Sequence, residues 1–153
     1  QKAILFGKKA EKNEELIKHS LNVCALSVKV GTKLRLSSQE LDDLGTAALI
    51  HDIGLNQNNL DLFYKQKKQL SNEEKKTYYT HTKDASALLA DKPYVNKAIL
   101  ELVINHEEVL SGTGPNKKLK LTKSEEILSL VNNYLGSLFA REHIILHNII
   151  ILQ

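Results

Sequence analysis

The chain has 153 residues, of which 42% are hydrophobic and 25% are charged, so it can bury a real core and is too apolar for a disordered chain. Its 21 Lys and Arg against 18 Asp and Glu residues give a formal net charge of +3, which is too small to indicate a surface for duplex nucleic acid. A single cysteine, Cys24, excludes an internal disulfide. The sequence shows no membrane-spanning or signal-peptide pattern. Together with the single cysteine, this favours a reducing, cytoplasmic setting.

Two prolines and seven glycines favour helices over a many-stranded sheet. Apolar residues at helical spacing predict helices over 13–36, 37–54, 71–92, 94–110 and 123–138, with a short helix near 60–64. Ser37 and Glu40 resemble a capping box that begins the second helix. The apolar segment 144–152 is too short to span a bilayer and is predicted to be a packed end segment. We therefore expect one all-α domain, a single helical bundle of about five to seven helices.

Histidines are spread along the chain in an informative way. Four of the six, His19, His51, His81 and His106, lie at or near the apolar faces of different predicted helices, and Asp52 directly follows His51. A metal site inside a helical bundle must draw its ligands from several helices. Imidazoles with a carboxylate suit a first-row transition metal, and Asp52 can bridge two ions through its two oxygens. The joint pattern predicts a metal site, because a buried Asp52 without a partner would cost several kcal/mol.

For any one histidine, a structural role in the core or at its boundary is the commoner outcome. We expect that outcome for His143 and His147, which are four residues apart near the end of the sequence. The chain begins at Gln1 and contains no methionine, so we also expect residues 1–153 to be a fragment of a longer protein.

The segment Leu44–Gly54, LGTAALIHDIG, resembles the signature helix of the HD superfamily of metal-dependent phosphohydrolases, and in particular of its HD-GYP branch, the bacterial cyclic di-GMP phosphodiesterases. The likeness extends over about residues 15–141 and includes a segment, 106–115, that is similar to the HHExxDGxGYP motif. It implies an HD-type helical bundle that hydrolyses a cyclic dinucleotide with a metal-activated water.

The same resemblance implies particular site residues. His51 and Asp52 would be catalytic. The expected metal ligands are Glu15, His19, His51, Asp52, His81, His106, Glu107 and Asn132. They would hold two or three divalent ions, with iron or manganese expected. Arg141 falls where the family has a substrate-facing arginine. Lys117, Lys118 and Lys120 are expected to attract the anionic substrate, although a solvated lysine run is the commoner outcome.

The chain also departs from the family pattern at several positions within the expected site. Glu107 replaces a histidine, Asn132 an aspartate, Leu55 a phosphate-contacting lysine and Ser111 an aspartate, and the GYP tyrosine is absent between Gly114 and Pro115. The change from aspartate to Asn132 removes a negative charge and should weaken ion binding. Two alternatives therefore stay open. The chain could be a degenerate, non-catalytic signalling or nucleotide-binding module with a signalling partner domain or protein, or an HD phosphohydrolase acting on another phosphate ester.

Overall fold

The structure is a computed structural model that describes residues 2–56 and 58–152, with side chains at 13–56, 58–138 and 140. The described residues form six α-helices and one short 3-10 helix, without a strand, which confirms the predicted all-α fold. The elements are α1 (Lys2–Lys33), α2 (Ser38–Ile50), α3 (Leu60–Phe63), η1 (Lys67–Gln69), α4 (Asn72–Leu89), α5 (Lys97–Ile104) and α6 (Lys123–Leu152).

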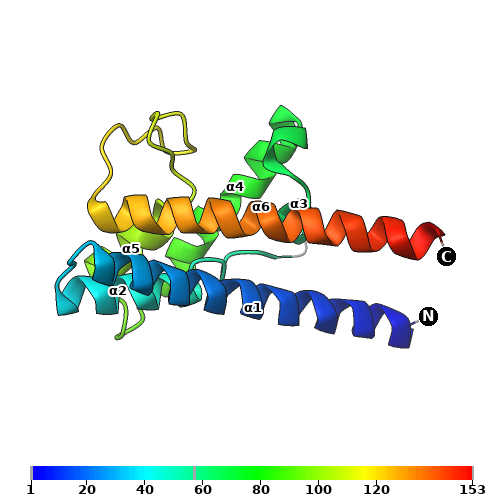
Figure 1. The fold of residues 1–153 in the computed structure, drawn as a ribbon, viewed down its shortest axis with the longest axis horizontal. Coiled ribbons are helices and arrows are strands. Elements are labelled where there is room, and N and C mark those ends of the chain that lie inside the picture. Colours follow the sequence, from blue (N-terminus) through cyan, green and yellow to red (C-terminus); the bar gives the residue numbers. More distant parts are fainter. Residues whose placement is uncertain (1, 57, 153) are drawn as a thin grey trace.

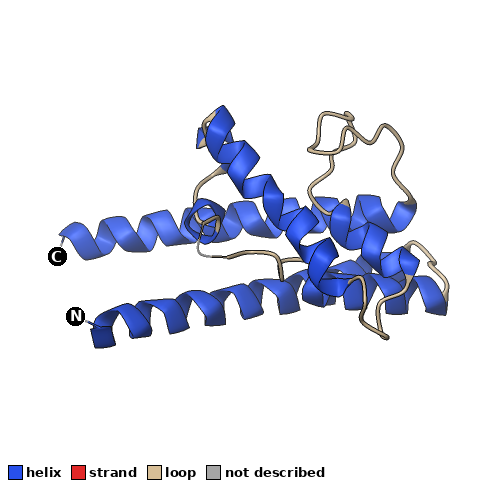
Figure 2. Ribbon diagram, turned by 180° about the vertical axis from the view of Figure 1, so that it is seen from behind, coloured by secondary structure: helices blue, strands red, loops and turns tan. Residues whose placement is uncertain are grey.

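The two long helices, α1 and α6, lie side by side and run in opposite directions, so both ends of the chain are at the same end of the molecule (Figure 1). Near the other end, α2 packs against α1 and α5 packs against α2. Helix α4 crosses the long pair obliquely and contacts α5 (Figure 2). Segments from all parts of the chain therefore meet in the middle of the bundle.

The core consists of two apolar clusters. The larger joins α1, α2, α4, α5 and α6, and the completely buried side chains of Val23, Leu44, Leu89 and Leu128 belong to it. The smaller lies beneath α3 and η1 and contains Phe63, Tyr64, Leu70 and Tyr78. Burial of such apolar surface is the main force that holds helices of this length together.

Three helix boundaries differ most from the predictions. Helix α1 begins at Lys2 rather than at Asn13, because the preceding residues, mostly good helix formers, extend it by several turns. Helix α5 spans only Lys97–Ile104, which leaves His106 just beyond its end rather than on it.

Helix α6 continues past residue 138 to Leu152, so the predicted end segment 144–152 is helical. The packing of its side chains lies outside the described residues. No helix in the described part of the chain combines the length and the apolar run that a membrane crossing needs.

Candidate metal centre

His51 and Asp52 lie at the end of α2, where the helix runs into a buried turn. The helix begins with a complete capping box: the Glu40 amide donates to the Ser37 hydroxyl at 3.1 Å, and the Ser37 amide donates to the Glu40 carboxylate at 3.0 Å. At the other end, Ala47 and Ala48 are buried, and His51 and Asp52 follow at 0% and 8% exposure. The small side chains of Ala47 and Ala48 allow the end of the helix to pack closely inside the bundle, and the charged Asp52 is therefore buried as well.

Gly54 determines how closely α4 approaches this turn. A Cβ atom at position 54 would lie 2.0 Å from the backbone oxygen of His81 and 2.7 Å from the backbone nitrogen of Ala85. Only glycine allows that approach. The contact sets His81, on the buried face of α4, against Asp52.

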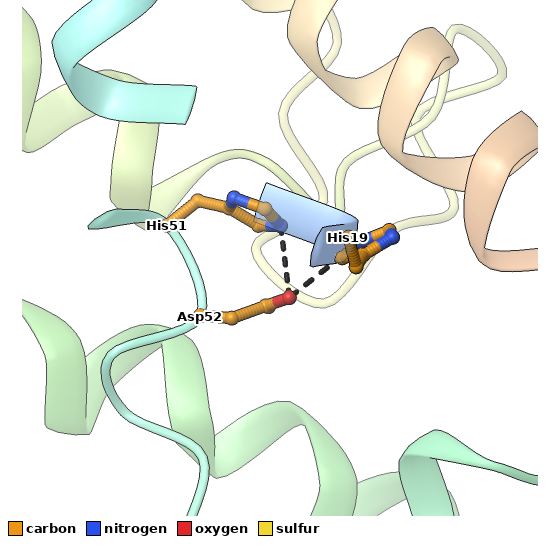
Figure 3. A group of neighbouring side chains, drawn as sticks. All are labelled: His19, His51 and Asp52. Atoms are coloured by element: carbon orange, nitrogen blue, oxygen red, sulfur yellow. Dashed lines mark ion pairs between the residues drawn. The ribbon is translucent and has the colours of Figure 1, made fainter. Parts of the chain in front are cut away.

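Asp52 stands between two pairs of imidazoles. Its Oδ2 atom is 2.9 Å from His51 Nε2 and 3.6 Å from His19 Nε2. Figure 3 shows these two ion pairs as dashed lines that meet at the Asp52 carboxylate. Its Oδ1 atom is 3.7 Å from His81 Nε2 and 3.5 Å from His106 Nε2. All five residues are buried. Each carboxylate oxygen thus serves one pair, which is the arrangement of a carboxylate that bridges two ions.

The backbone fixes the orientation of three of these rings. The Nδ1–H groups of His51, His81 and His106 donate to the carbonyl oxygens three residues earlier, at 2.6, 2.6 and 2.5 Å. With the proton on Nδ1, each Nε2 atom presents a lone pair to the centre. The Nε2 atoms of His81 and His106 face one another at 2.9 Å, and two lone pairs at that distance call for a cation between them.

Acceptor atoms also outnumber donors around the first pair. Asn132 Oδ1 lies 2.9 Å from His19 Nε2 and 3.1 Å from His51 Nε2. Neither oxygen of Asp52 accepts a hydrogen bond from the described part of the chain. A buried carboxylate without donors is costly unless a cation is bound to it. The residues therefore fit divalent metal, with His19, His51 and Asp52 as one ligand group and Asp52, His81 and His106 as another.

The electrostatics favour the deprotonated forms of Asp52, His19 and His81, whereas they favour the protonated form of His51. Burial would raise the pKa of Asp52, but His51, His106 and His19 outweigh it and hold the pKa well below the usual range. Burial lowers the pKa values of His19 and His81. For His51 burial also lowers the pKa, yet the adjacent Asp52 outweighs it and raises the pKa. A proton on His51 is thus the natural competitor of the metal.

Glu107 is buried next to these groups but has its own partners. Its Oε1 atom accepts a hydrogen bond from the Tyr78 hydroxyl at 2.8 Å, and Lys67 Nζ forms an ion pair with its Oε2 atom. Oε1 is also 3.6 Å from His81 Nε2 and 3.7 Å from His106 Nε2. Lys67 and Tyr78 were missed by sequence reasoning, since neither a lone lysine in a polar stretch nor a tyrosine on an apolar helix face stands out.

The remaining predicted residues lie farther from the imidazoles or carry other contacts. Glu15 is one helical turn from His19 and interacts with the Tyr64 hydroxyl; burial and Glu15 together raise the pKa of Tyr64.

The ammonium of Lys118 binds both carboxylate oxygens of Glu125 at 2.8 Å. Exposed Lys117 has a positive φ of 51°, and Lys120 is exposed in the same loop. The side chain of Arg141, in α6, lies outside the described residues. Their roles stay predictions.

Two hollows lie next to the cluster. One, of about 30 Å³, lies between the 62–67 segment and α6, and Phe63, Lys67 and Asn132 line it. Phe63 also packs edge-on against His19, with ring centroids 5.2 Å apart. The other, of about 250 Å³, lies between α1 and the end of α2, with apolar walls that include exposed Ile17 and Leu49 and with Asp52 in its lining. Asp52 therefore lies at the wall of an apolar groove, with its carboxylate oxygens buried behind that wall.

Comparison with solved structures supports the fold. Bd1817, a HDG"Y"P protein from Bdellovibrio bacteriovorus, superimposes with a TM-score of 0.61 at 21% sequence identity. The superposition covers 81% of this chain and 40% of Bd1817. At this identity the likeness concerns the arrangement of the helices.

Comparison of sequences identifies the family. Cyclic di-GMP phosphodiesterase PdeB of Borreliella burgdorferi is 29% identical over 132 residues, which are 84% of this chain and 32% of that protein. Cyclic di-GMP phosphodiesterase PA4108 of Pseudomonas aeruginosa is 28% identical over 96 residues, 63% of this chain and 23% of that protein. The chain thus spans about a third or less of the length of these curated relatives. Residues 9–132, which include the five His and Asp residues of the cluster, match the model of the family described as HD domain, and the chain belongs to that family.

Proposed function

We propose that this chain is a metal-dependent phosphodiesterase domain that hydrolyses a cyclic dinucleotide of the cyclic di-GMP class. The observation that carries the proposal is Asp52, a buried carboxylate with one oxygen toward each of two imidazole pairs and no hydrogen-bond donor on either. The two relatives named above as cyclic di-GMP phosphodiesterases support the choice of substrate. The apolar groove beside Asp52 offers room for a base.

Each imidazole pair, together with Asp52, would hold one divalent ion. His19, His51 and Asn132 would serve the first ion and His81 and His106 the second, while Glu15 would reach a third ion or support His19. Iron or manganese suits such a mixed imidazole and carboxylate set. When bound, such ions lower the pKa of water and neutralise charge on a phosphate group.

The chain's own residues do the positioning. The carbonyl oxygens of Ala48, Tyr78 and Val103 lock the rings with Nε2 toward the centre. Burial keeps His19 and His81 neutral and therefore able to bind metal. Ionised Asp52 holds the two halves of the site at a fixed separation. The half-buried single thiol of Cys24 is compatible with the reducing cytoplasm, where we place the domain.

A non-catalytic signalling module is the second candidate, and one observation favours it. Glu107 is engaged by Lys67 and Tyr78, so a position that carries a metal-binding histidine in the HD-GYP pattern carries an internal ion pair here. Such a module would bind a nucleotide or a partner protein without turnover.

Asp52→Ala tests the proposal. We expect wild-type protein, purified without chelator and reconstituted with iron or manganese, to hold about two ions per chain and Asp52→Ala to lose metal and activity together. Metal content is measured by elemental analysis, and turnover is compared for cyclic di-GMP, its linear product and a generic phosphodiester. Asp42→Ala, on the exposed face of the preceding helix α2, is the matched control.

Activity that survives Asp52→Ala would contradict the bridging role. Wild-type protein with less than about one ion per chain would remove the basis for hydrolysis. Metal-loaded wild-type protein that binds cyclic di-GMP without cleaving it would establish the second candidate.

A further inference from the structure

We propose that Lys67 contacts the substrate: its ammonium group, which Glu107 and Tyr78 hold beside the imidazole cluster, binds the phosphate group that is to be cleaved. The assignment rests on the proposed function, because it takes a phosphate ester to be the ligand of this site. It adds a residue from the 3-10 helix η1 that no sequence motif indicates.

Glu107 is the positioning residue in this arrangement. Its carboxylate is completely buried, yet both of its oxygens have protein partners, Tyr78 on Oε1 and Lys67 on Oε2. Asp52, which shares His81 and His106 as neighbours with Glu107, has no such donors. The two carboxylates thus have different tasks: Asp52 is left open for cations, whereas Glu107 is already committed to holding Lys67 in place.

The location of Lys67 suits a phosphate contact. Glu107 Oε1 lies 3.6 Å from His81 Nε2, so the ammonium on its other oxygen is adjacent to the place where an ion would sit. Lys67 lines the cavity between residues 62–67 and α6, and Asn132, which contacts His19 and His51, lines it too. A phosphate group that entered from that cavity would meet the Lys67 ammonium on one side and Asn132, which contacts two of the imidazoles, on the other.

Lys67 also keeps donors free for a ligand. An ammonium group has three N–H donors, and Glu107 takes one of them. The side chain retains 37% exposure, which leaves it accessible. The other lysines of the segment face outward: Lys65 pairs with Glu74 at 2.6 Å on the surface, and Lys68 is exposed. Among these three lysines, only Lys67 is turned inward.

The experiment measures phosphate binding separately from turnover. Manganese-loaded wild type, Lys67→Met and Lys67→Arg are titrated with inorganic phosphate by calorimetry, and their metal content is measured on the same samples. We expect Lys67→Met to keep the wild-type metal content and to bind phosphate about tenfold more weakly or worse, the loss expected for one charge-assisted hydrogen bond. Lys67→Arg keeps the charge and should recover much of the affinity. Lys68→Met, the same change one residue along, should behave as wild type.

Unchanged phosphate affinity in Lys67→Met would overturn the assignment, and so would a loss of metal in that variant, which would make Lys67 a support of the metal site. If Lys67→Met does not fold because Glu107 is left unpaired, the double variant Lys67→Met/Glu107→Gln removes both charges and should show the same weak phosphate binding. Wild type that binds phosphate through Lys67 but cleaves no phosphodiester would refute only the proposed catalysis. Turnover and phosphate affinity that are both independent of Lys67 would refute only this inference.

Discussion

At the scale of single residues, the site contains two buried carboxylates whose surroundings differ. Asp52 is surrounded by imidazole nitrogens that present lone pairs, whereas Glu107 is matched with a lysine and a tyrosine. Burial by itself would raise the pKa of Glu107, but Lys67, His106 and His81 outweigh burial and lower the pKa to about 2. Glu107 is therefore ionised throughout the neutral range, and its charge contributes to the stability of the fold.

This pKa predicts how stability depends on acid. Since the folded pKa of about 2 lies below the ordinary 4.5, the contribution of Glu107 is complete above about pH 4.5 and disappears as the pH falls toward 2. In metal-free protein, we expect the free energy of unfolding of wild type to exceed that of Glu107→Gln by a margin that shrinks by about 2 kcal/mol between about pH 5 and pH 3. Urea titrations at each pH measure this margin. Glu14 is exposed, so the difference in the free energy of unfolding between wild type and Glu14→Gln should not change with pH. A margin for Glu107→Gln that is equally constant would show that Lys67 does not hold Glu107 ionised.

The sequence was sufficient to predict the residues that the bundle brings together, but not all of their partners. His19, His51, Asp52, His81 and His106 stood out because each is a polar group in an apolar helical context. Lys67 did not, because its burial depends on the path of the 56–70 segment across the bundle, which side-chain periodicity does not encode. The pairing of Glu107 with Lys67 is a contact across 40 residues, and only the folded chain shows it.

At the scale of elements, helix existence was predictable and helix ends were less so. The capping box at Ser37 and Glu40 is confirmed, since its signal lies within four residues. The end of α5 was predicted too late, because Asn105 leaves the helix and donates to Glu125 of α6 at 2.7 Å. A tertiary hydrogen bond of that kind overrides local propensity. It also turns His106 toward Asp52.

The contact between the 51–54 turn and α4 predicts the effect of Gly54→Ala. The added Cβ would collide with backbone atoms of His81 and Ala85, which cannot rotate away. Helix α4 must therefore shift, and this shift moves His81 away from Asp52. We expect a loss of about 3 kcal/mol in the free energy of unfolding and a fall of about one ion per chain in metal content. Urea unfolding and elemental analysis measure the two effects.

Gly136→Ala is the matched control for that change. A Cβ at Gly136, in the interior of α6, would have no atom within 4 Å, and we expect it to raise stability by about 1 kcal/mol through helix propensity. If Gly54→Ala retained full stability and full metal content, the close packing of α4 on the turn would not be what sets His81 in place.

At the scale of the whole molecule, the imidazole cluster connects parts of the chain that are far apart in sequence. Its members come from α1, from the turn after α2, from α4, from the residue pair after α5 and, through Asn132, from α6. Two apolar clusters flank it, one formed mainly by α1, α2, α5 and α6 and one beneath α3 and η1. Ions bound here would join helices that are otherwise held together mainly by side-chain packing.

Metal should therefore stabilise the entire fold. Manganese at about 100 times its dissociation constant adds about 2.7 kcal/mol to the free energy of unfolding, which for a chain of this length raises the melting temperature by about 5–10 °C. We expect calorimetry to show that rise on adding manganese to chelator-treated wild type, and to show almost none for Asp52→Ala, because that variant lacks the bridging ligand. A melting temperature of wild type that is the same with manganese and with chelator would mean that the five residues do not act together as a metal site, since ligands from four separate segments cannot bind an ion without resisting their separation.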